Sequence, residues 1–151
     1  MEKATYLTQR EEEKNYILNT LNDYFKDKHE ILFAYLFGSY AKGCENSLSD
    51  IDVAVYYSRD DISKDIDMYL NMRMELMELL KKDVDLVVLN TANPLLKSRI
   101  INNRVRILSK DTLVEGEFVS RSLGEYFDVA PYMEMQYQKA ILQMEEGITD
   151  G

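Results

Sequence analysis

Two short apolar segments joined by a polar connector constrain the fold of this chain more than any other feature. Residues 31–37 and residues 51–57 are each seven residues long and almost wholly apolar, a pattern typical of buried strands. A Gly-Ser pair, residues 38–39, follows the first segment, and ten residues later Asp50 and Asp52 flank the start of the second. The sequence therefore predicts two strands whose connector carries small, hydroxyl and acidic side chains.

The two aspartates are predicted to project from the same side of the second strand. Alternate residues of a strand face the same side, so Ile51, Val53 and Val55 would point into the core. Asp50 and Asp52 would then project together. Two neighbouring carboxylates repel each other, and burial strips them of water. A hard divalent cation such as Mg²⁺ relieves both costs, because it takes oxygen ligands and shares them with substrate phosphates.

Gly38 and Ser39 are the candidate phosphate contacts. A glycine lets the backbone approach a phosphate closely, and the serine adds a hydroxyl and an N–H donor beside a helical turn predicted at residues 40–42. The alternative for Ser39 is a helix cap, which is compatible with a second role in binding. Phosphate contacts beside metal-binding carboxylates predict nucleotide chemistry.

The order Gly-Ser, ten residues, Asp-x-Asp resembles the signature of the polymerase β-like nucleotidyltransferase superfamily. The short chain is similar to its minimal branch, the MNT domains that act as antitoxins beside HEPN-domain toxins. The resemblance covers residues 1–110 and implies an α/β (α+β) fold, with a small mixed sheet flanked by helices. Residues 111–151 are expected to form an acidic helical tail that packs on the core or on a partner.

The resemblance also implies a third carboxylate on a strand next to the Asp-x-Asp strand, where it would help to hold a second metal ion. Asp85 is the candidate, because it interrupts the apolar segment at residues 84–89. Asp83 faces the same side by period-two counting and is the rival. Asp85 is preferred because Asp83 adjoins Lys81 and Lys82, where a solvated charge needs no special explanation.

Helical periodicity and turn residues predict the elements that surround these strands. Proline at residue 94 favours a helix start there, and Pro131 is expected to break or kink the tail helix. Helices are expected at residues 8–25, 61–81, 93–102 and 113–144, and a last strand at residues 104–109.

Charge and composition exclude several classes of partner. The net charge is −9; residues 1–110 carry 18 acidic and 16 basic side chains, and residues 111–151 carry 9 and 2. Nucleic-acid binders need a basic surface, so no extended DNA or RNA substrate is expected. The acidic tail suits a basic protein partner, or serves only as a solvated helix. A single cysteine and the lack of an apolar run of about 20 residues predict a cytoplasmic protein that does not bind membranes.

The resemblance implies transfer of AMP from ATP to a tyrosine hydroxyl of a cognate HEPN ribonuclease toxin. Asp50, Asp52 and Asp85 would hold two Mg²⁺ ions, and the antitoxin would form a hetero-oligomer with the toxin. HEPN toxins carry an Arg-x4–6-His motif, whereas His29, the single histidine here, has no arginine at that spacing. Two alternatives stay open: adenylylation of a small molecule such as an aminoglycoside, and neutralisation of a toxin by occlusion without catalysis.

Overall fold

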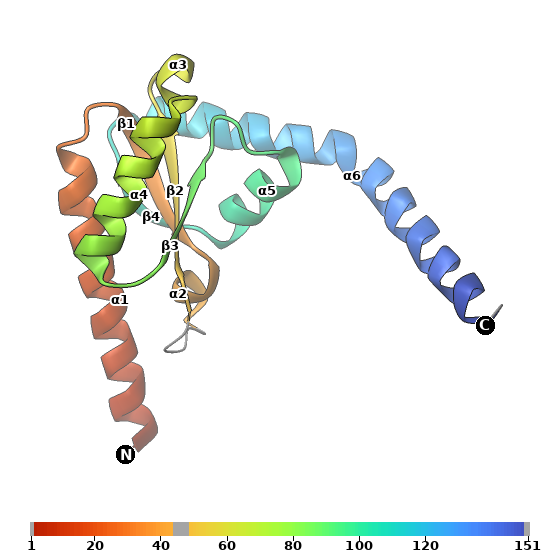
Figure 1. Cartoon of the computed structure of the whole chain (residues 1–151), viewed down its shortest axis with the longest axis horizontal. Coiled ribbons are helices and arrows are strands. Elements are labelled where there is room, and N and C mark those ends of the chain that lie inside the picture. The colour runs from red at the N-terminus through yellow and green to blue at the C-terminus, as the bar shows by residue number, and fades with distance from the viewer. Residues whose placement is uncertain (1, 44–48, 150–151) are drawn as a thin grey trace.

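The computed structural model describes residues 2–43 and 49–149. Within these residues, four strands form one mixed sheet, and six helices accompany it, with helices on both faces of the sheet (Figure 1). In chain order they are α1 (Glu2–Lys26), β1 (Ile31–Phe37), α2 (Gly38–Lys42), β2 (Ile51–Tyr57), α3 (Asp60–Ser63), α4 (Ile66–Leu80), β3 (Val84–Val88), α5 (Pro94–Asn103), β4 (Val105–Ser109) and α6 (Thr112–Thr149).

The sheet has the strand order β3-β2-β1-β4. The strand β1 pairs antiparallel with both β2 and β4, and β2 pairs parallel with β3. A parallel pair needs a crossover connection, which α3 and α4 provide. This mixed sheet flanked by helices confirms the predicted fold class.

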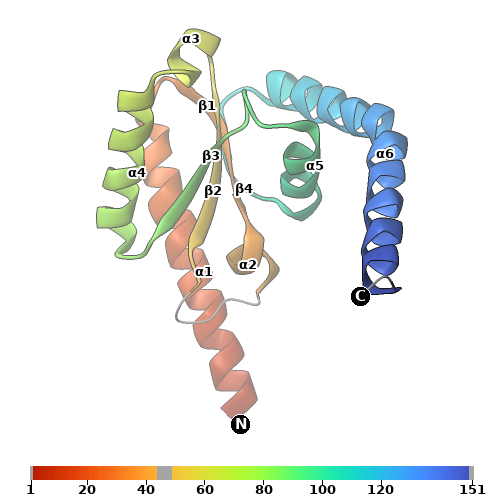
Figure 2. The same ribbon diagram turned by 45° about the vertical axis from the view of Figure 1, so that its right-hand side comes forward.

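Each face of the sheet is covered by two helices (Figure 2). On one face, α1 and α4 enclose a core cluster that contains Ile51, Val53 and Val55, so the predicted direction of these side chains is confirmed. On the other face, α5 and α6 pack over a second cluster that contains Phe33 and Ala54. The alternation of β2 between two apolar layers explains why its sequence is apolar at nearly every position.

The prediction of one continuous helix at residues 61–81 is wrong, because the structure contains two helices there, α3 and α4. Asp65 separates them: it adopts an extended conformation, and its side chain accepts a hydrogen bond from the backbone N–H of Met68 at 3.1 Å. An aspartate that caps the next helix competes with continuation of the previous one. The apolar periodicity continues across this break, which is why it predicted a single helix.

The tail forms the single helix α6, which continues through Pro131. Figure 1 shows that the helix changes direction partway along its length, in agreement with the predicted kink. A proline removes one backbone hydrogen bond and displaces the preceding turn, but a helix of this length can absorb that loss as a bend. None of the described helices is both long enough and apolar enough to cross a membrane.

The first turns of α6 are fastened to the sheet by a buried glutamate. Glu115 is only 2% exposed, and its carboxylate accepts a hydrogen bond from the Tyr35 hydroxyl at 2.6 Å. The Arg106 guanidinium lies 2.8 Å from the other carboxylate oxygen. Burial alone would raise the pKa of Glu115, but the bonds from Tyr35 and Arg106 outweigh it and hold that pKa below its ordinary value. The proximal part of the tail is therefore integral to the core.

Candidate functional site

The pairing of the strands brings three sequence-predicted residues to one end of the sheet. Phe37, which precedes Gly38, pairs with Asp52 in the antiparallel β1–β2 ladder. In the parallel β2–β3 ladder, Asp52 pairs directly with Asp85. The end of β1 and the starts of β2 and β3 therefore meet, and Gly38, Asp52 and Asp85 lie together.

Asp52 and Asp85 also interact through their carboxyl groups. The pKa of Asp52 is raised to about 6 by burial, which is the largest cause, together with the negative charges of Asp85 and Asp50 and a hydrogen bond with Asp85. Asp83 instead offers its backbone carbonyl, which accepts a hydrogen bond from the Ile51 N–H at 2.9 Å. The side chain that adjoins Asp52 is thus Asp85, the residue preferred on the sequence pattern.

Gly38 lies directly against the Asp52 carboxylate. Its backbone has a φ of +72°, and a Cβ added at this position would lie 2.0 Å from Asp52 Oδ2 and 2.7 Å from Cγ. Any side chain at residue 38 would therefore collide with the carboxylate and would also strain the backbone. The contact explains why a glycine follows the end of β1.

Ser39 is the second residue of α2 and is half-buried. The helix begins at Gly38, and the capping position is occupied by Phe37, which makes no side-chain capping bond. The alternative that Ser39 serves only as the helix cap is therefore wrong, because the helix starts at Gly38, two residues before the predicted turn at residues 40–42. The connector between α2 and β2, including Cys44, lies largely outside the described residues.

The acidic cluster suits a divalent cation that also binds phosphate. Within the described residues, no group of three or more His, Cys, Asp or Glu side chains is arranged to hold a metal ion unaided. Mg²⁺ typically takes only one or two protein carboxylates and completes its shell with substrate phosphates and water. The Asp52 carboxyl, whose pKa is raised by burial and by two neighbouring acids, fits this requirement, because a cation could replace the proton that the cluster favours.

Two basic residues of α1, which sequence analysis did not single out, also reach this end of the sheet. Arg10 donates a hydrogen bond to the carbonyl oxygen of Gly43 at 2.9 Å, and Lys14 donates one to the carbonyl oxygen of Ala41 at 3.2 Å. Their spacing in the sequence could have identified them, because Arg10 and Lys14 continue the apolar stripe of α1 toward its N-terminus.

Comparisons with known proteins agree with this geometry. The family model described as polymerase beta, nucleotidyltransferase matches residues 19–113. The protein named Putative protein adenylyltransferase from Methanocaldococcus jannaschii is 38% identical over 81 residues, which cover 54% of this chain and 84% of that protein.

Solved structures show the same fold. A crystal structure of a toxin–antitoxin with AMP-PNP matches with a TM-score of 0.73 and 22% identity, over 82% of this chain and 98% of the matched chain. A structure of a tri-AMPylated Shewanella oneidensis HEPN toxin in complex with an MNT antitoxin matches with a TM-score of 0.65 and 21% identity, over 87% and 98%. At these identities the likeness demonstrates a shared architecture.

Proposed function

The chain belongs to the polymerase beta nucleotidyltransferase family, and from this premise we propose that it is an antitoxin that transfers AMP from ATP to a tyrosine hydroxyl of a HEPN-domain toxin. The observation that carries the proposal is the meeting of Asp52, Asp85 and Gly38 at one end of the sheet. Similarity to a named adenylyltransferase and to toxin–antitoxin structures supports the choice of reaction and partner.

Each residue of the site has a role in this reaction. Gly38 and Ser39 contact the triphosphate, because the glycine leaves the backbone open and the serine adds a hydroxyl. Asp50 and Asp52 are the carboxylates that would hold Mg²⁺ together with the phosphates, and Asp85 would join them at a second ion. When bound, Mg²⁺ neutralises charge on the phosphates and lowers the pKa of the acceptor hydroxyl.

The transfer itself needs no covalent intermediate with this chain. The tyrosine hydroxyl gives its proton to solvent, and its oxygen forms a bond to the α-phosphorus of ATP. The bond from that phosphorus to the bridging oxygen of the β-phosphate breaks, so pyrophosphate leaves and AMP remains on the tyrosine. Asp85 is exposed at the mouth of the site, where an acceptor held by a partner protein can reach it. The contribution of the chain is therefore to orient both substrates and to concentrate negative ligands.

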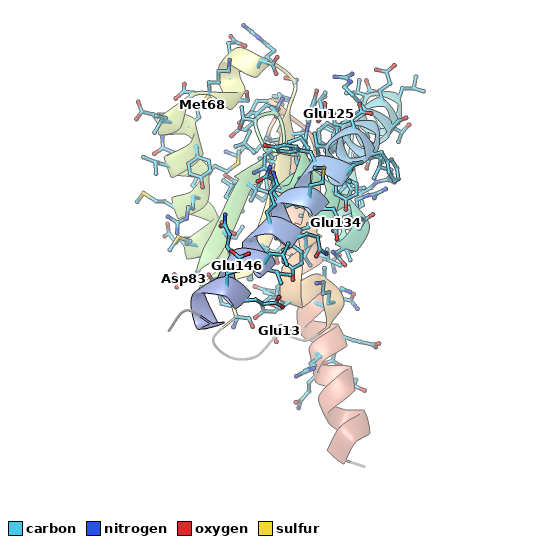
Figure 3. The ribbon with its side chains drawn as sticks, turned by 90° about the vertical axis from the view of Figure 1, so that its right-hand side faces the viewer. Glu13, Met68, Asp83, Glu125, Glu134 and Glu146 are labelled. Atoms are coloured by element: carbon cyan, nitrogen blue, oxygen red, sulfur yellow. The ribbon has the colours of Figure 1, made fainter. Side chains whose placement is uncertain are left out.

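The distal half of α6, residues 131–149, is the proposed docking arm for the toxin. Figures 1 and 2 show that it turns away from the sheet and descends toward the end of the molecule at which α2 lies. Acidic side chains are spread along it, among them Glu134 and Glu146 (Figure 3). Several large apolar side chains on it are more than half exposed: Tyr132, Met135, Tyr137, Leu142 and Met144. A partner seated on this arm would face the acidic cluster. We therefore propose residues 1–110 as the catalytic unit and residues 111–151 as a tail whose first turns pack on the core and whose distal half recruits the partner.

The decisive experiment combines the purified protein, Mg²⁺, ATP labelled at the α-phosphate and, as the candidate toxin, the product of the neighbouring gene. Label on a toxin tyrosine, abolished in Asp50→Asn and Asp85→Asn but retained in Asp83→Asn, is the expected result. Label transferred instead to an aminoglycoside in a parallel reaction would indicate a small-molecule enzyme. Neutralisation of the toxin by Asp50→Asn as effectively as by the wild type would indicate occlusion without catalysis.

A further inference from the structure

The helix α2 carries both candidate phosphate contacts, but its own sequence does little to stabilise it. It is five residues long, whereas isolated helices shorter than about 12 residues are marginal in water. Its capping residue makes no side-chain hydrogen bond, and its first turn holds no acidic side chain. The position of α2 must therefore depend on contacts with other elements.

Two cationic side chains of α1 bind the C-terminal end of α2. Arg10 Nη1 donates to the Gly43 carbonyl at 2.9 Å, and Lys14 Nζ donates to the Ala41 carbonyl at 3.2 Å. Carbonyls at a helix C-terminus lack partners within the helix and carry partial negative charge. A positive donor therefore satisfies these groups and also interacts favourably with the helix dipole.

Arg10 and Lys14 occupy the face of α1 that points toward the core. They precede the buried residue Ile17 by seven and three positions, a spacing that places all three on one side of a helix. Both are half-buried, whereas residues 11–13 between them are exposed. Figures 1 and 2 show that α1 continues past the end of the sheet. The core-facing stripe thus changes from apolar to basic where the sheet ends and α2 begins.

The middle of α2 is anchored separately. Tyr40 is 1% exposed within the core, and the Lys82 ammonium lies 5.7 Å from the centre of its ring. Loss of the contacts from α1 should therefore shift or loosen the ends of α2 without unfolding the protein.

We propose that Arg10 and Lys14 are positioning residues for nucleotide binding, an inference that rests on the proposed function. They act through the backbone of α2, so that Gly38 and Ser39 stay aligned beside Asp52. Their own roles require no contact with the reacting atoms.

The test uses the full-length variants Arg10→Met and Lys14→Met, singly and together. Two quantities are measured: the dissociation constant of AMP-PNP with Mg²⁺ by calorimetry, and amide hydrogen exchange over residues 38–43. Each single variant should exchange faster in this segment and bind AMP-PNP about fivefold to tenfold more weakly, as expected for loss of one charged hydrogen bond at a partly exposed site. Lys14→Arg should restore both quantities. Lys26→Met removes the same charge from the other end of α1 and should change neither.

Unchanged exchange over residues 38–43 in the double variant would overturn the proposal, because α2 would then be held by other contacts. Faster exchange with unchanged affinity would also overturn it, because the position of α2 would not matter for the nucleotide. Failure of the wild type to bind AMP-PNP would refute the proposed function instead, and the exchange measurement would still decide whether the basic contacts hold α2.

Discussion

Replacement of Gly38 by alanine should disable the site through two separable costs. A left-handed backbone costs an alanine about 1 kcal/mol, and this applies at the observed φ of +72°. The new Cβ would also lie 2.0 Å from Asp52 Oδ2, and ordinary contact requires at least 3.4 Å. The Asp52 side chain must therefore move by more than an ångström, and overpacking of this kind costs about 1–3 kcal/mol. We expect a total loss of about 2–4 kcal/mol in the free energy of unfolding.

Gly43 provides a matched control for this substitution. Its φ is +73°, but an added Cβ would meet nothing within 4 Å among the residues that the structure describes. Gly43→Ala should therefore cost only the backbone strain, and the change in unfolded-state entropy is the same for both variants. Urea denaturation measures the difference in stability, which should be about 1–3 kcal/mol. Because a displacement of 1 Å can lower a rate about 100-fold, AMP transfer should fall by that order in Gly38→Ala and far less in Gly43→Ala. Equal stability and equal activity of the two variants would refute the reasoning.

Three further substitutions or truncations test other parts of the structure. Asp52→Asn, studied in EDTA, should gain stability relative to the wild type as the pH rises from 4 to 7. The reason is that the pKa of the Asp52 carboxyl is raised from 3.8 to about 6 in the folded protein, which therefore holds the proton more tightly than the unfolded chain does. The gain in the free energy of unfolding should be about 1–2 kcal/mol after allowance for solvent screening, and a pH-independent difference in urea titrations would contradict it. Glu115→Ala should cost about 3 kcal/mol by leaving buried partners unsatisfied, whereas the exposed neighbour Glu117→Ala should stay within about 0.5 kcal/mol. A chain ended after Ala130 should keep its melting temperature within a few degrees, because Ser122 is the last buried residue among those described in α6. It should lose affinity for the proposed toxin partner, and intact binding in a pull-down would exclude the docking arm as the surface that binds it.

The strands and their motif were predictable because the information lies in short stretches of sequence. Apolar residues in a run of seven, ended by a glycine or opened by an aspartate, mark β1 and β2 without any knowledge of their neighbours. In the sequence, Asp85 could be preferred over Asp83 only because of the residues that flank each of them. The physical reason that Asp85 adjoins Asp52 is the parallel register of β2 and β3. Register depends on the crossover through α3 and α4, which no local pattern specifies.

Other features depend on contacts between distant residues and were not predictable from periodicity. The Gly38–Asp52 contact joins a strand end to a strand start, and a glycine after a strand is equally common in turns. The α1 contacts with α2 span 33 and 27 residues, and a basic residue on a helix is usually a solvated one. The capping role of Asp65 was visible in its residue type, but the apolar spacing on either side of it favoured a continuous helix.

The topology of the sheet explains why the acidic cluster forms at a single place. An antiparallel pair sets the end of β1 beside the start of β2, and a parallel pair sets the start of β3 beside the start of β2. Asp52 and Asp85 therefore adjoin each other where the backbone of Gly38 leaves no room for a side chain, and the charge of Asp50 also acts on Asp52. In the isolated protein this arrangement disfavours the ionised form of Asp52, as its raised pKa indicates, and among the described residues no positive side chain in the cluster offsets the charge. The same arrangement becomes favourable when cations and phosphates share the charge, so the stability gained on adding ATP and Mg²⁺ should depend on Asp52 and should vanish in Asp52→Asn.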